Sequence, residues 1–194
     1  MSRYSIELYF DPSLENQVLK SWNVLARRQI STHLIKIESR PHITLFSSLF
    51  VDPPRLEHAL KSFCAKHDPL PITFFAIGSN SSEKNVLFLV PKPNVQLLQF
   101  QERLCEVLRK ETGLELSEEF RVGGAGGSGG WAPWCAVGEE VSKGRMGEGF
   151  CVLREVVNLP VSGYGVDVGL VELGGPNSTV REVCSFVLGN GVDG

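Results

Sequence analysis

The sequence has few histidines, and none of them lies in its second half. The four are His33, His42, His58 and His67, so no side chain beyond residue 67 can supply an imidazole. The sequence also lacks a Cys-x-x-Cys pair, because its five cysteines stand singly along the chain. Zinc sites require Cys and His ligands at short, paired spacings. We therefore expect neither a zinc site nor a metal cofactor.

Long apolar runs and a surplus of positive charge are missing as well. No segment approaches the roughly 18 uninterrupted apolar residues of a membrane span, and no basic segment followed by an apolar run opens the chain. With an odd number of cysteines, this predicts reduced thiols in the cytoplasm or the nucleus. The formal net charge is −3, whereas proteins that hold long nucleic acids are usually basic. A small pocket for one or two nucleotides is not excluded.

What is present is an ordinary globular composition. Of 194 residues, 42% are hydrophobic and 21% are charged. This size allows a single domain over residues 1–194, made of one core or of two intimately packed lobes. We expect a monomer, although the sequence does not determine the oligomeric state.

Hydrophobic periodicity predicts an order of elements. Alternation indicates strands and an apolar stripe at helical spacing indicates helices. The expected strands are 4–10, one or two within 30–50, 70–77, 86–90, 131–137, 165–173 and 180–188, and the expected helices are 12–28, 55–66, 95–112 and 139–156. Sheets built from hairpins with helices packed outside define an α+β fold class.

Residues 123–130 consist almost entirely of glycine. We expect a flexible surface loop, because these residues have no side chains that could pack. No Gly-Lys-Ser/Thr follows, so the stretch is not a phosphate-binding loop of the nucleotide-hydrolase type. A mobile flap beside a cleft is the alternative interpretation.

The segment Arg40-Pro41-His42-Ile43-Thr44-Leu45-Phe46 carries the clearest chemistry. It is typical of a strand entered through a proline. Alternation places His42 and Thr44 on one face, and Ile43 and Leu45 on the other. A proton-transferring imidazole then lies beside a hydrogen-bond donor, an arrangement suited to a phosphate group.

The run Pro-His-Ile-Thr-Leu resembles the first signature of the 2H phosphoesterases, which carry two His-x-Thr/Ser motifs. The superfamily includes RNA cyclic phosphodiesterases, the 2′-5′ RNA ligases and many plant proteins, and the plant type is the most similar. The second motif would fall in Trp131-Ala132-Pro133-Trp134-Cys135-Ala136-Val137. There Trp134 replaces the histidine and Ala136 replaces the hydroxyl residue, so the second motif is degenerate.

The resemblance implies a two-lobed fold, with antiparallel sheets backed by helices around a central cleft. It also implies metal-independent chemistry in which His42 transfers a proton and Thr44 holds the phosphate. From the residues themselves, further candidates for substrate binding are Trp134, Tyr9, Arg40 and Arg121. An indole can stack on a base, and a guanidinium can bind phosphate through paired hydrogen bonds. We expect Cys135 to be a small buried residue rather than a nucleophile.

The functional hypothesis is a phosphodiesterase-like protein that acts on cyclic-phosphate nucleotides or RNA ends. Its first half-site is intact and its second is degenerate, so weak or altered activity is expected. One alternative is a catalytically inactive protein that binds a nucleotide or an RNA end. Another is an interaction scaffold that keeps only the fold. The sequence leaves these three open.

Overall fold

The computed structural model describes residues 3–49, 51–80, 85–115, 117–120, 130–174 and 178–189. Its fold is α+β, as predicted. The helices and strands in chain order are β1 (Arg3–Phe10), α1 (Pro12–Arg27), α2 (His33–Lys36), β2 (His42–Ser48), α3 (Pro53–Cys64), β3 (Leu70–Asn80), β4 (Val86–Pro91), α4 (Val95–Thr112), β5 (Cys135–Gly138), α5 (Met146–Val156), β6 (Val161–Leu173) and β7 (Val180–Val187).

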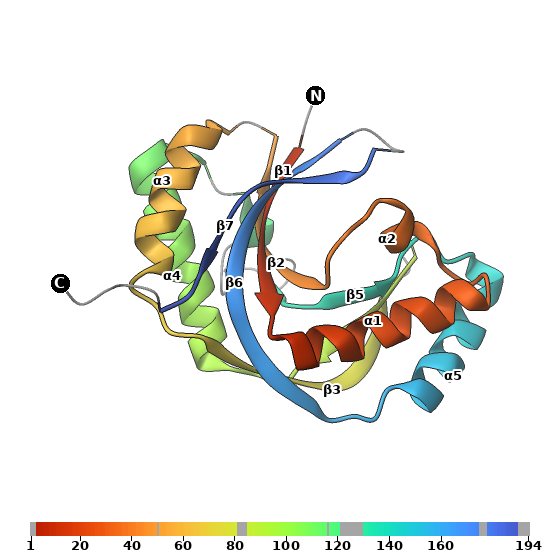
Figure 1. Cartoon of the computed structure of the whole chain (residues 1–194). Coiled ribbons are helices and arrows are strands. Elements are labelled where there is room, and N and C mark those ends of the chain that lie inside the picture. The colour runs from red at the N-terminus through yellow and green to blue at the C-terminus, as the bar shows by residue number, and fades with distance from the viewer. Residues whose placement is uncertain are drawn as a thin grey trace.

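The described strands form one seven-stranded antiparallel sheet in the order β2-β1-β6-β3-β4-β5, with β7 also paired to β6. The long strand β6 joins the two halves of this sheet. Its C-terminal part pairs with β1 and β7, and its N-terminal part pairs with β3. Figure 1 shows β6 as a bent strand between the helix pair α3 and α4 and the helix pair α1 and α5. The two lobes are therefore halves of a continuous sheet.

The strands β2 and β5 lie at opposite ends of the sheet order, yet they contact each other. The indole Nε1–H of Trp131 donates to the carbonyl of Thr44 at 2.9 Å. The backbone of His42 also lies close enough to the Cys135 thiol to affect its pKa. Curvature of the sheet thus brings together the two strands that carry the intact motif and the degenerate motif.

Local sequence explains where the helices begin and end. Asp11 caps α1, because its Oδ1 accepts from the backbone N–H groups of Ser13 and Leu14 at 2.9 and 3.1 Å. Asn94 caps α4 in the same way. Gly113 ends α4 with φ 71°, a left-handed conformation that glycine adopts without steric cost.

Two predicted elements were partly wrong. One or two strands were predicted within residues 30–50; the structure has one, β2, and residues 33–36, which alternate in the sequence, form the one-turn helix α2. Gln29 and Glu38, on either side of it, have positive φ values of 53° and 54°, which interrupt an extended chain. A helix was predicted from residue 139, but α5 begins at Met146 after a 3₁₀ turn at Lys143–Arg145. The predicted loop 123–130 lies outside the described residues, except for Gly130.

Candidate functional site

A cleft of about 800 Å³ lies over the polar face of β1 and β2. In β1, alternation points Arg3, Ser5 and Glu7 to this face. In the paired strand, His42, Thr44 and Ser47 line it. The residues between them, Ile43 and Leu45, are fully buried in the core. The remaining lining residues are His33, Leu34, Ile37, Ser39, Glu119, Phe120, Gly130, Trp131, Ala132, Trp134, Glu139, Glu140, Leu173, Gly174, Ser178 and Val180.

Two contacts to Nδ1 fix the orientation of the His42 imidazole. Its Nδ1 lies 2.6 Å from the carbonyl oxygen of Arg40 and 3.4 Å from Oε2 of Glu7. A carbonyl oxygen can only accept, so Nδ1 carries the proton and Nε2 is the basic nitrogen of the neutral ring. Among the described residues, none forms a hydrogen bond or ion pair with Nε2. The ring is therefore oriented to exchange a proton through Nε2.

A buried hydrogen bond supports this orientation. Glu7 is 3% exposed, and its Oε2 accepts from the hydroxyl of Tyr9 at 3.0 Å. Burial and the neighbouring Glu7 carboxylate raise the pKa of Tyr9, so its hydroxyl stays protonated and keeps donating. The arrangement Tyr9–Glu7–His42 resembles the carboxylate support that fixes an imidazole in hydrolytic sites.

Two further groups of the first half-site suit an anionic ligand. Thr44 lies opposite Glu7 in the strand pairing, and both line the cleft. Arg3 donates through Nε to the hydroxyl of Ser47 at 2.7 Å, which leaves its terminal N–H groups for other acceptors. Arg3 was not among the substrate-binding candidates predicted from the sequence, although its alternation with Ser5 and Glu7 would have placed it on this face.

The second half-site offers aromatic surface in place of acid–base groups. Trp134 is half-buried, lines the cleft and packs against Phe88, with ring centroids 4.4 Å apart and the rings tilted by 35°. Trp131 also lines the cleft and is only 8% exposed. Cys135 is fully buried, and burial raises the pKa of its thiol to about 12. A thiol of this kind is protonated at neutral pH and is not a nucleophile.

The other candidates from the sequence lie elsewhere. Tyr9 is buried behind Glu7, and neither Tyr9 nor Arg40 lines the cleft. The guanidinium of Arg40 lies 4.3 Å from the centre of the Tyr9 ring and pairs with Glu15 at 2.7 Å. The structure therefore does not bring Tyr9 and Arg40 to the cleft wall, and their contact with substrate stays a prediction. Arg121 lies outside the described residues.

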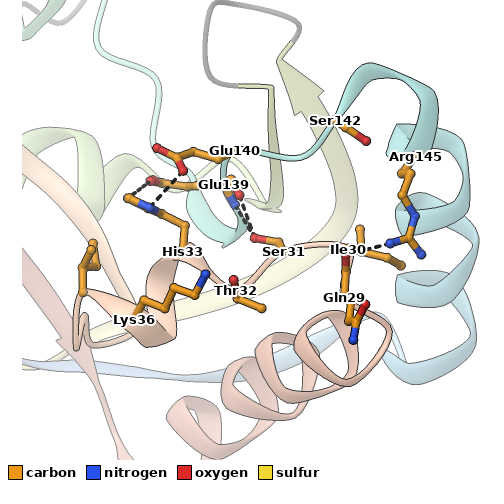
Figure 2. Close-up of a pocket in the computed structure, with 11 residues that line it drawn as sticks. Gln29, Ile30, Ser31, Thr32, His33, Lys36, Glu139, Glu140, Ser142 and Arg145 are labelled. Atoms are coloured by element: carbon orange, nitrogen blue, oxygen red, sulfur yellow. Dashed lines mark hydrogen bonds and ion pairs between the residues drawn. The ribbon is translucent and has the colours of Figure 1, made fainter. Parts of the chain in front are cut away.

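A second cavity, of about 530 Å³, adjoins the cleft. The two share His33, Ile37, Glu139 and Glu140 as lining residues. Figure 2 shows the His33 ring beside both carboxylates, with Ser142 and Arg145 across the cavity. The His33 side chain is only 16% exposed, and no local pattern in the sequence indicated its partners, which are more than 100 residues away.

The described part of the chain contains no group of three His, Cys, Asp or Glu side chains arranged to hold a metal ion. Among its helices, none has the length and apolar character needed to cross a membrane.

Solved structures of other proteins share this fold. The chain matches LigT of E. coli complexed with 3′-AMP at 14% identity and a TM-score of 0.62, over 96% of this chain and 98% of that one. A structure of TT0787 of Thermus thermophilus matches at 14% identity and a TM-score of 0.61, again over 96% and 98%. LigT complexed with ATP matches at 12% identity and a TM-score of 0.59, with the same coverage. The fold is thus that of LigT and related phosphoesterases.

The sequence itself places the chain in a family. Residues 12–146 match the 2′-5′ RNA ligase superfamily, and this range includes both the His42 strand and the Trp134 segment. The protein belongs to this superfamily. No curated protein sequence matches it significantly.

Proposed function

We propose that this protein is a phosphodiesterase that opens the cyclic phosphate of a nucleotide or an RNA end, with His42 as its proton-transfer group. The observation that carries the proposal is the position of His42 on the concave wall of the cleft. Its Nδ1 is held by the Arg40 carbonyl, its basic Nε2 is left for the cleft, and Thr44 lies on the same face. Membership of the superfamily supports the same reaction class.

The dimensions and walls of the cleft suit a ligand of nucleotide size. Pockets for small molecules span roughly 300–1,000 Å³, and this cleft of about 800 Å³ lies within that range. Trp131 and Trp134 add aromatic surface to the cleft wall, and Trp131 donates to the Thr44 carbonyl of the His42 strand. A base stacked on the half-buried indole of Trp134 would gain roughly 1–3 kcal/mol. The base would then lie against Trp134, with the phosphate near Thr44 and Arg3.

The first half-site can perform the first part of the reaction. As water attacks phosphorus, Nε2 of His42 accepts its proton. Glu7, 3.4 Å from Nδ1, stabilises the imidazolium that forms. The Thr44 hydroxyl and the Arg3 guanidinium donate to the phosphate oxygens, whose negative charge grows in the transition state. The bond from phosphorus to one ribose oxygen breaks, and that oxygen must receive a proton.

The test uses the four nucleoside 2′,3′-cyclic phosphates with purified protein, and products are separated by chromatography. We expect slow, saturable turnover that falls by at least about 100-fold in His42→Ala, because one positioned proton-transfer group contributes about 10²–10⁴ in rate. His58→Ala is the matched control, since His58 is exposed on α3 and does not line the cleft. Wild-type turnover unaffected by His42→Ala would refute the proposal.

A second function is favoured by one observation, the aromatic pair at the degenerate motif. Trp134 packs against Phe88 and lines the cleft where the second histidine would stand. A site of this kind can bind a nucleotide without hydrolysing it. Titration with the same cyclic phosphates and with nucleoside monophosphates separates the two functions. Saturable quenching of tryptophan fluorescence without product formation would support binding alone.

A further inference from the structure

The cleft contains a second imidazole, and it does not come from either motif strand. His33 lies on α2 and lines the same cleft as His42. Its Nδ1 lies 3.3 Å from Glu140 Oε2, and its Nε2 lies 3.7 Å from Glu139 Oε2. Both carboxylates directly follow β5, the strand in which the degenerate motif lies. The second half of the site therefore holds an imidazole through two glutamates.

The backbone fixes this arrangement at several points. The hydroxyl of Ser31 donates to the carbonyl of Glu139 at 2.7 Å and accepts from the N–H of the same residue at 3.0 Å. These two bonds join the start of α2 to the end of β5. At the other end of α2, the N–H of Val180 donates to the carbonyl of Ile37 at 2.7 Å. Hydrogen bonds therefore attach both ends of this short helix to residues at the ends of β5 and β7.

Glu140 has a φ of 54°, an uncommon conformation for a residue with a side chain. Backbone strain of this kind is frequent at functional sites. Here it accompanies the contact between the Glu140 carboxylate and Nδ1 of His33. In Figure 2 both carboxylates lie on the same side of the His33 ring.

We infer that His33 is the second proton-transfer group of this cleft and takes the role left vacant by Trp134. The inference rests on the proposed function. In its protonated form, His33 is held by Glu140 at Nδ1. Its Nε2, which is beyond hydrogen-bonding distance of Glu139, carries the proton for the substrate. As the bond from phosphorus to the ribose oxygen breaks, this proton passes to the leaving oxygen, while His42 takes the proton of the attacking water.

The two histidines together then account for both protons that move in the reaction. One proton is gained at His42 and one is lost at His33, and the next turnover requires their exchange with solvent. The other charged or titratable groups on the walls of the two cavities, each able to affect this exchange, are Arg3, Glu7, Lys36, His42, Glu119 and Arg145.

The decisive experiment measures kcat and KM for a nucleoside 2′,3′-cyclic phosphate from pH 5 to pH 9. We expect His33→Gln to lower kcat by about 10²-fold or more while KM changes less than about threefold, and the alkaline limb of the profile to disappear. In Glu140→Gln, which replaces the carboxylate 3.3 Å from Nδ1 of His33, we expect a smaller fall in kcat, again with little change in KM. His58→Gln serves as the control and should match the wild type.

Each outcome has a distinct meaning. Wild-type turnover that depends on His42 but is unchanged in His33→Gln overturns this inference and leaves the proposed function standing. An effect of His33→Gln on KM or on the unfolding midpoint, with kcat preserved, assigns the residue a structural role and also overturns it. Absence of wild-type turnover overturns the proposed function and the inference together.

Discussion

The two motif strands, β2 and β5, offer the same framework with different side chains. In β2 the residue between His42 and Thr44 is Ile43, which is fully buried. In the second segment the residue between Trp134 and Ala136 is Cys135, which is fully buried as well. The backbone contacts also correspond. Trp131 donates its indole N–H to the Thr44 carbonyl at 2.9 Å, and Trp22 donates its own to the Ala136 carbonyl at 3.1 Å.

This comparison separates what the fold requires from what the chemistry requires. The inward residue and the backbone carbonyl are needed for the core and the sheet edge, and both halves meet those needs. The cleft-facing residues contribute little to the core, so they can differ without loss of the fold. The first half has an imidazole with a buried carboxylate behind it, whereas the second half has an indole.

Restoring the second motif should have the largest effect. We expect the double variant Trp134→His/Ala136→Thr, made in the His33→Gln background, to raise kcat for a nucleoside 2′,3′-cyclic phosphate by about 10²-fold or more over His33→Gln alone, since it supplies a positioned acid in place of His33 and adds a phosphate donor. Threonine suits the strand position of Ala136. The loss of the Trp134–Phe88 ring contact should cost about 0.5–1.5 kcal/mol of stability.

The single variant Trp134→Phe provides the control, because it keeps an aromatic ring but adds no proton-transfer group. Its kcat should remain near that of the wild type. If the double variant is folded by circular dichroism and gains nothing, the two motif positions do not face a common substrate, and the proposed reaction geometry is wrong.

The buried residues of the two motifs should differ in their response to alkaline pH. Burial raises the pKa of Cys135 from 9.0 to about 12. A raised pKa means that the native state keeps a proton that the unfolded chain releases. The stabilisation is thus complete below pH 9 and is lost as the pH rises towards 12. Between pH 8 and pH 10.5 the thiol should account for about 2 kcal/mol of lost stability.

Urea denaturation of the wild type and of Cys135→Val at these two pH values tests this expectation. The variant should lose about 2 kcal/mol less than the wild type over the interval, because valine, like Ile43 in the first motif, does not ionise. Cys151→Val is the control, since Cys151 is exposed. Equal losses in wild type and Cys135→Val would show that the thiol ionises as readily in the folded protein as in the unfolded chain.

The sequence was sufficient for most of the elements and for the cleft-facing pair His42 and Thr44, because local patterns determine these. Alternation in residues 4–10 and 42–46 identified the strands and the cleft-facing pair His42 and Thr44. It could not identify the site of His33. That residue lies in a one-turn helix that is too short to show periodicity, and its partners Glu139 and Glu140 are brought close only by the tertiary fold.

The same limit explains the assignments of Tyr9 and Arg40. Alternation places Tyr9 on the same side of β1 as Glu7, and in the structure the Tyr9 hydroxyl does donate to Glu7. Alternation could not show that the Arg40 guanidinium covers the Tyr9 ring, 4.3 Å from its centre. Glu7 reaches the cleft, whereas Tyr9 is buried behind it.

The two tryptophans that donate to the motif strands provide a smaller and more symmetrical test. Trp131→Phe and Trp22→Phe each remove one indole hydrogen bond and keep an aromatic ring in the core. We expect each to lower the free energy of unfolding by about 1–2 kcal/mol, because the carbonyl of Thr44 or Ala136 loses a partner. Chemical denaturation measures this.

Activity should distinguish the same two variants. Trp131 lines the cleft and is bound to the strand that carries His42, so Trp131→Phe should raise KM for the cyclic phosphate severalfold. Trp22 is bound to the second strand and is buried on α1, so Trp22→Phe should leave KM within about twofold of the wild type. A larger change in KM for Trp22→Phe would mean that the position of β5 matters more to the substrate than that of β2.

The smallest effect is expected at Arg40, which supports the first half-site from the surface. Its guanidinium, 38% exposed, pairs with Glu15 and lies over the Tyr9 ring. An exposed ion pair contributes about 0.2–1 kcal/mol, and a cation–π contact at an exposed site a similar amount. We therefore expect Arg40→Gln to lower the free energy of unfolding by about 1 kcal/mol and to change kcat and KM less than threefold.

The comparison variant is Arg3→Gln, which removes a guanidinium that does line the cleft and should raise KM at least about tenfold. If Arg40→Gln instead raised KM as much as Arg3→Gln, substrate would have to reach Arg40, and the boundary of the site would extend beyond the cleft to the face that carries Glu15 and Asp167.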